Sequence, residues 1–161
     1  MPDARATRRV TTGTDDRGHA IVVREEWLDG DPRARVLWGA DAPPVLRADG
    51  VPPVREGWWP PPGGIRVSLC QRRPEADHEK AAESVQAWPD IHDDAGFHAS
   101  SSIDVVVMLS GTVTLELDDG IIVTLNEGDS LVQNGTRHRW RNRSDTVATM
   151  AVIVVGAEGF R

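Results

Sequence analysis

The chain has 161 residues, of which 39% are hydrophobic and 27% are charged. This size and balance are typical of one globular domain, and they exclude a disordered chain or a membrane-embedded one. The formal net charge of −7 opposes attraction to nucleic acid or to an anionic membrane, so we expect neither as a partner. The single cysteine, Cys70, excludes an internal disulfide, and the N-terminus has no apolar signal segment. Together these features predict a cytoplasmic protein.

The first part of the chain contains short strand-like segments separated by turn-rich sequence. The segments are Arg8–Thr12, Ala20–Arg24 and Arg35–Trp38. The sequence WWPPPGG at 58–64 ends this region, because proline cannot donate a hydrogen bond to a sheet. We predict that residues 1–64 form an N-terminal arm packed on the rest of the protein, and that residues 65–161 form the main domain.

The main domain begins with a predicted strand at Ile65–Gln71, followed by a polar excursion over 72–96 with one short helical possibility at Glu79–Trp88. From residue 96 onward, β-branched segments alternate with turn signals at roughly 8–12-residue spacing, which is typical of antiparallel sandwiches and barrels. The alternation in Thr112–Leu117 predicts a half-buried strand with Thr114 and Glu116 on its solvent face. The sequence therefore predicts an all-β fold with little helix.

Residues able to hold a metal occur at matching positions in this strand-rich half. His98 and Asp104 are six residues apart, so both side chains leave the same face of an extended chain. His138, Trp140 and Asn142 share a face in the same way. If one face of each strand points into a barrel, two imidazoles and one carboxylate converge there. Such a set suits Fe(II), and also Mn, Ni or Zn.

Other features narrow the possible chemistry. The alternating arginines 137 to 143 resemble an anion-binding stripe, but a solvated outer strand face balanced by nearby acidic residues explains them better. No glycine-rich phosphate loop or dinucleotide fingerprint is present, so we expect no nucleotide cofactor. A serine-hydrolase elbow is also missing from the sequence.

Two motifs in residues 65–157 resemble those of the cupin superfamily, particularly its small single-domain bacterial members. The first motif is His98, Asp104 and Gly111, and the second is Gly128-Asp129 with Gly135-x-x-His138-x-x-x-Asn142. The resemblance implies a single jelly-roll-type antiparallel β-barrel. It also implies a homodimer, which agrees with an arm that carries four of the six tryptophans.

The motifs depart from the usual pattern at three places. Ser100 takes the position of a second histidine, and Asp104 takes that of a glutamate. The segment between the glycines at 128 and 135 is one residue short and lacks the usual proline. The resemblance therefore implies His98, Asp104 and His138 as ligands of one divalent transition metal. Water, Gln133 or His92 remain open as the fourth ligand.

The sequence supports three functional hypotheses. The first is a metal-dependent cupin enzyme acting on a small oxygenated organic metabolite as a dioxygenase, cyclase, isomerase or dehydratase, without an assigned catalytic residue. Its substrate pocket or the surroundings of its metal would include Ser100, Gln133, Trp140 and Asn142. The alternative is a metal-free cupin that binds a small molecule without catalysis. The third is an interaction protein that uses the tryptophan-rich arm.

Overall fold

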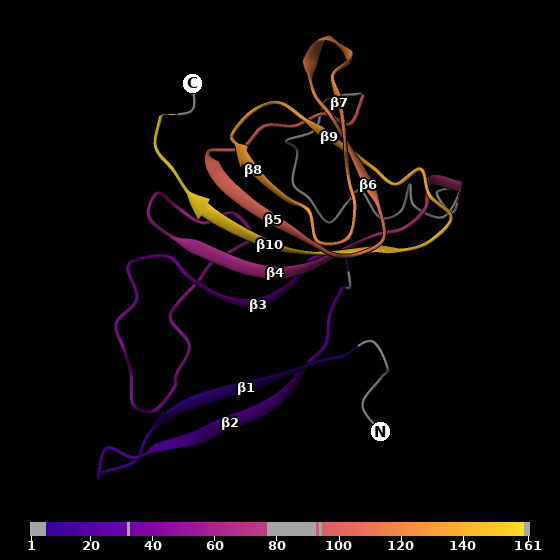
Figure 1. Cartoon of the computed structure of the whole chain (residues 1–161). Helices are drawn as coiled ribbons and strands as arrows, with labels where there is room; N and C mark the ends of the chain where they lie inside the picture. Colours follow the sequence, from indigo (N-terminus) through magenta and orange to yellow (C-terminus); the bar gives the residue numbers. More distant parts are fainter. Residues whose placement is uncertain (1–5, 32, 77–92, 94, 160–161) are drawn as a thin grey trace.

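The computed structural model describes residues 6–31, 33–76, 93 and 95–159. These residues form an all-β, antiparallel structure without an α-helix, which confirms the predicted fold class (Figure 1). Within the same ranges, no helix is long and apolar enough to cross a membrane. The predicted helix at Glu79–Trp88 and most of the 72–96 excursion lie outside the described residues.

The described strands form three sheets. A two-stranded sheet pairs β1 with β2, a five-stranded sheet has the order β3-β4-β10-β5-β8, and a three-stranded sheet has the order β7-β6-β9. Their bounds are β1 Thr7–Thr14, β2 Ala20–Leu28, β3 Arg35–Ala40, β4 Ile65–Arg72, β5 Ser102–Ser110, β6 Val113–Glu116, β7 Ile122–Leu125, β8 Ser130–Asn134, β9 Arg139–Arg141 and β10 Ala148–Gly156. Each segment that the sequence predicts as a strand before residue 72 is present, and each is longer than predicted.

The core lies between the five-stranded and the three-stranded sheet. Strands β4, β10 and β5 are in antiparallel register, so every second side chain of each strand points to the same side of the sheet. Val106 of β5 and Met150 of β10 meet Val113 of β6 and Leu125 of β7 in one buried cluster. The two sheets thereby close a small apolar interior around which the functional side chains are placed.

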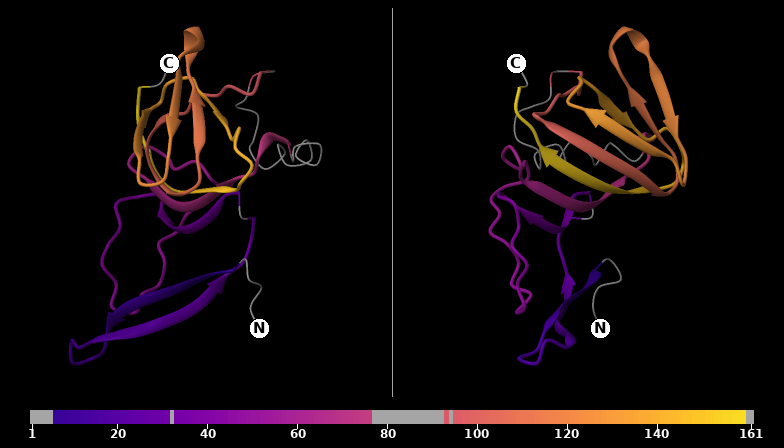
Figure 2. Two further views of the ribbon diagram at one scale, coloured as in Figure 1. Left: turned by 45° about the vertical axis from the view of Figure 1, so that its right-hand side comes forward. Right: turned by 60° about the vertical axis from the view of Figure 1, so that its left-hand side comes forward.

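The β1–β2 hairpin lies apart from this two-sheet body (Figure 2). It pairs only within itself among the described strands, and polar contacts join it to β3 and to the segment after β3. The backbone N–H of Thr14 donates to the carbonyl of Ala48 at 3.0 Å, and the Arg35 guanidinium donates to Oγ1 of Thr7 at 2.7 Å. Strand β3 itself belongs to the main sheet. The domain boundary at residue 64 and the homodimer stay predictions.

Strand β6 differs from the expected half-buried pattern, because all four of its residues are buried. Val113 and Leu115 face the core as predicted, but Thr114 and Glu116 are also covered. The carboxylate of Glu116 accepts hydrogen bonds from Arg139 and Arg143, and these arginines shield that face of the strand. Ion pairing has thus turned a predicted solvent face into a buried polar layer.

Candidate functional site

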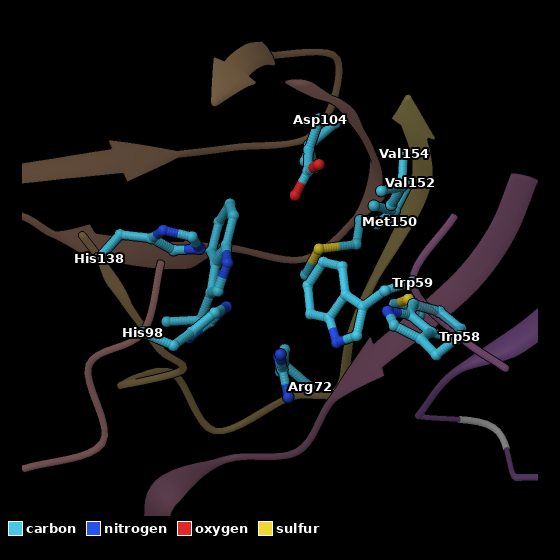
Figure 3. Close-up of a pocket in the computed structure, with 12 residues that line it drawn as sticks. Trp58, Trp59, Arg72, His98, Asp104, His138, Met150, Val152 and Val154 are labelled. Atoms are coloured by element: carbon cyan, nitrogen blue, oxygen red, sulfur yellow. The ribbon is translucent and has the colours of Figure 1, made fainter. Parts of the chain in front are cut away.

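A cavity of about 50 Å³ lies against the inner face of the five-stranded sheet. Histidine, aspartate and arginine side chains reach it, while its remaining wall is aromatic, aliphatic and sulfur-bearing (Figure 3). Its lining residues are Trp58, Trp59, Cys70, Arg72, His98, Asp104, Val106, His138, Trp140, Met150, Val152 and Val154. A cavity with an apolar wall and a few converging polar groups is the usual form of a small-molecule site.

The two histidines of this cavity are neighbours through a short antiparallel bridge. Each backbone N–H donates to the carbonyl of the other, at 2.9 Å from His98 and 2.8 Å from His138. The centroids of the imidazole rings are 4.3 Å apart. Nδ1 of His138 lies 2.8 Å from the carbonyl oxygen of Thr136. Because a carbonyl only accepts, this nitrogen carries the proton, and in the neutral ring Nε2 carries the lone pair.

Asp104 projects into the cavity from β5, on a different side from the histidines (Figure 3). It is only 8% exposed. Oγ of Ser102 lies 2.7 Å from its Oδ1, and Ser102 in turn lies 2.8 Å from Oγ of Ser100. Burial disfavours the carboxylate and outweighs the Ser102 hydrogen bond, so the pKa of Asp104 is raised above its ordinary 3.8. The carboxyl therefore keeps its proton to a higher pH than an exposed aspartate does.

Arg72 brings a guanidinium to the cavity from the end of β4. Its Nε is buried and makes no hydrogen bond to any residue in the described part of the chain. Burial lowers the pKa of Arg72 below its ordinary value, and Cys70 and Arg33 are the described residues whose charges act on it. Arginine nevertheless stays charged in proteins. The cavity thus contains a permanent cation.

The third ionisable group of the wall is the thiol of Cys70. This side chain is 5% exposed and forms part of the hydrophobic cluster behind the cavity. Burial raises the pKa of Cys70 to about 11. The thiol is therefore protonated at neutral pH, and the structure gives no support to a nucleophilic role for it.

The described residues do not assemble the predicted metal-ligand set. Although His98, Asp104 and His138 line one cavity, no group of three or more His, Cys, Asp and Glu side chains within the described ranges could hold a metal ion. Asp104 is instead engaged by Ser102, and the position of a second histidine holds Ser100, whose hydroxyl is a poor ligand. Metal binding stays a prediction, and His92, one of the open fourth ligands, lies outside the described residues.

The other predicted pocket residues have different locations. Trp140 lines the cavity, with its ring edge-on to that of His138 at 6.0 Å between centroids. The amide of Gln133 donates to the carbonyl of Thr136, and that of Asn142 donates to two backbone carbonyls. Ser100 borders a separate pocket on the outside of the barrel. Of these four residues, Trp140 alone is part of the cavity lining.

Sequence reasoning missed the contribution of residues before 73. Trp58 and Trp59, two of the tryptophans of the predicted arm, lie in the cavity wall with Arg72 (Figure 3), and Cys70 also lines the cavity. One signal could have found the last two. Arg66, Ser68, Cys70 and Arg72 alternate along β4, so that a charged residue at each end shares the inward face of the strand.

The arginines of the 137–143 segment pair with carboxylates on the outside of the barrel. Arg137 contacts Asp93 and Asp118, while Arg139 and Arg143 contact Glu116. These contacts hold the pKa of Glu116 below its ordinary 4.5. The stripe is accordingly a balanced outer face, as interpreted from the sequence.

The sequence around several of the cavity residues matches a known protein family. Residues 91–155 match the family described as cupin domain. The phomopsin biosynthesis cluster proteins C' and D of the fungus Diaporthe leptostromiformis are each 47% identical over 57 residues, which is 35% of this chain. The match spans only 30% of the length of these two relatives.

Two further similarities extend over more of the chain. A protein of Neurospora crassa named cupin-domain-containing oxidoreductase srdB is 27% identical over 146 residues, covering 89% of this chain and 70% of that protein. Among solved structures, a cupin-domain protein from the bacterium Bordetella pertussis is 24% identical with a TM-score of 0.39, covering 58% of this chain and 82% of that one.

Proposed function

Because the chain belongs to the cupin superfamily, with its cupin domain at residues 91–155, we propose that its cavity is the active site of an enzyme that transfers protons on a small organic metabolite. One observation carries this proposal. Within a single cavity, Asp104 has a raised pKa on one side and a histidine pair lies on another. A carboxyl group and an imidazole that reach one cavity from different sides can act as an acid–base pair on a single substrate.

The roles follow from the raised pKa and from the histidine tautomer. The raised pKa of Asp104 favours it as the general acid, and His138 is the general base through Nε2, because Thr136 holds the ring proton on Nδ1. The base removes a proton from a carbon next to a carbonyl as Asp104 protonates the carbonyl oxygen, which gives an enol. Returning the proton to another carbon makes the reaction an isomerisation. Where Asp104 instead protonates a departing hydroxyl, the products are an alkene and water.

The donor set supports proton transfer better than metal chemistry. A cupin metal site needs its ligands to converge on one point, and no three-ligand group is present among the residues that the structure describes. Proton transfer needs only that acid and base reach different atoms of one substrate. The names of the two phomopsin relatives mention a biosynthesis cluster, which supports a role in metabolite biosynthesis for this chain as well.

The test is deuterium exchange in phenylpyruvate, whose carbon next to the keto group exchanges through an enol. Untagged, EDTA-treated protein should accelerate deuterium incorporation from D₂O, followed by proton NMR. Asp104→Asn should reduce the rate roughly 10²–10⁴-fold, because that is the usual contribution of a general acid or base. Asp119→Asn is the matched control, since it makes the same chemical change at an exposed turn residue.

Two outcomes would overturn the proposal. One metal ion per chain in elemental analysis, lost in His98→Ala and required for exchange, would establish the metal-dependent enzyme instead. No exchange above the buffer rate, together with saturable ligand binding, would establish the metal-free binding protein.

A further inference from the structure

The charges around the cavity favour an anionic ligand. Arg72 is permanently charged, and the buried thiol of Cys70, whose pKa is raised to about 11, is neutral at ordinary pH. Cys70 and Arg33 are the described groups whose charges act on Arg72, and the guanidinium of Arg33 is hydrogen-bonded to Asp31. The cavity therefore presents a positive charge that no described side chain neutralises.

Three other arginines of the described ranges have a carboxylate partner, which Arg72 lacks among the described residues. Arg33, Arg66 and Arg139 each hydrogen-bond to a carboxylate. The Nε of Arg72 is buried without a hydrogen-bond partner in the described structure. A buried charged group without a partner lowers stability, so such a group is a common sign of a missing ligand.

The shape of the site identifies the class of that ligand. A guanidinium presents a planar fork of N–H donors that matches the two oxygens of a carboxylate. The rest of the cavity wall includes Trp58, Trp59, Met150 and Val152, which offer aromatic and apolar contacts. A carboxylate attached to a flat apolar body satisfies both parts of the wall.

We propose that Arg72 binds the carboxylate of the substrate, which is a small aromatic or apolar carboxylic acid, while the body of the substrate packs against the tryptophans. This assignment rests on the proposed function for its orientation: the carboxylate lies at Arg72, and the reacting carbon lies between Asp104 and His138. Arg72 is then a residue that determines specificity and takes no part in proton transfer.

The experiment measures binding, so its result does not depend on turnover. Benzoate and the uncharged isostere benzamide are titrated into the full chain by calorimetry. Benzoate should bind at least tenfold more tightly than benzamide. Arg72→Met should weaken benzoate binding about 10- to 100-fold and leave benzamide unaffected, because a pair of charge-assisted hydrogen bonds is lost. Arg72→Lys should restore part of the affinity, since it keeps the charge without the fork.

Arg73→Met is the matched control, because Arg73 is the exposed neighbour of Arg72. It should bind benzoate as the wild type does. Equal affinity for benzoate and benzamide, no binding of either, or unchanged benzoate binding in Arg72→Met would overturn the proposal. The comparison of the two probes on the wild-type protein stands even if a variant fails to fold. Selective benzoate binding without exchange in phenylpyruvate would refute the proposed function and leave this inference intact.

Discussion

Arg66 and Arg72 lie six residues apart on β4 with their side chains on the same face, yet their surroundings are opposite. Arg66 is completely buried, and its guanidinium donates hydrogen bonds to the carboxylate of Asp41 and to four backbone carbonyls, those of Ala40, Glu56, Gly57 and Ile65. Arg72 reaches the cavity with a buried Nε that has no hydrogen-bond partner among the described residues. One arginine ties the segment after β3 to the sheet, and the other is left for a ligand.

The same contrast separates two buried carboxyl groups. Glu116, on the outer sheet, is held by Arg139 and Arg143, and its pKa is lowered. Asp104, in the cavity, has a hydrogen bond from the Ser102 hydroxyl as its one polar side-chain contact with a described residue, and its pKa is raised. We expect the paired charges of Arg66 and Glu116 to stabilise the fold, and the charges of Arg72 and Asp104 in the cavity to lower its stability. The comparison therefore predicts opposite signs for matched substitutions in the two regions.

The largest effect is expected for Arg66→Met. The substitution removes three hydrogen bonds from the Arg66 guanidinium to backbone carbonyl oxygens, each with an N···O distance of 3.2 Å or less, and also the contact with Asp41. At about 1 kcal/mol for each bond, the free energy of unfolding should fall by about 3 kcal/mol or more. Urea unfolding of this variant beside Arg73→Met measures the loss. A change as small as that of the exposed control would break the comparison.

Glu116→Gln should lower the free energy of unfolding at neutral pH by about 1–3 kcal/mol, because hydrogen bonds to a charged group are lost. The pKa of Glu116 is depressed, so the stabilisation is present above its ordinary 4.5 and disappears as the pH falls below that value. The difference between wild type and variant should thus shrink in acid. Unfolding curves over a pH series would show this, and a constant difference would contradict the ion-pair explanation.

Asp104→Asn should have the opposite sign and a smaller size. The pKa of Asp104 is raised, so the fold carries no penalty below about 3.8 and an increasing one as the pH rises through the folded-state value. The variant should gain stability relative to wild type as the pH increases toward neutrality. Thermal unfolding of both proteins from acid to neutral pH provides the measurement. A variant that becomes less stable than wild type with rising pH would place Asp104 among the structural charges.

The smallest effect on stability is expected for Arg72→Met. The Arg72 guanidinium has a buried Nε and no carboxylate partner among the described residues, so its removal should leave the free energy of unfolding unchanged or slightly higher, because a neutral methionine side chain loses less hydration than a guanidinium does. Urea unfolding in the absence of added ligand tests this. A loss comparable to that of Arg66→Met would show that Arg72 supports the fold.

Most of the fold was predictable because strand alternation and turn signals are local properties. The strands at Ile65–Arg72 and Val113–Glu116 follow directly from periodicity. The burial of Glu116 was not predictable, since it depends on arginines that approach from another strand, β9, and from the turn after it. The placement of the hairpin also rests on contacts distant in the sequence, such as that between Thr14 and Ala48.

The candidate site was predictable only in part. Motif spacing identified His98, Asp104 and His138, and all three line the cavity. It could not give their mutual distances, which depend on how two sheets pack. The contribution of Arg72 escaped the motif because this residue comes from a strand that precedes it. Only the structure shows that the Nε of Arg72 is buried without a hydrogen-bond partner among the described residues.

The position of Cys70 has a practical consequence. It is the only cysteine of the chain, and it lies in the wall of the cavity. Because the thiolate is the reactive form and the pKa is about 11, alkylating reagents should modify the native protein slowly, and only at this point. A molecule seated against the same wall should slow the modification further. The half-time of alkylation is therefore a gauge of cavity occupancy that the natural sequence supplies without an added label.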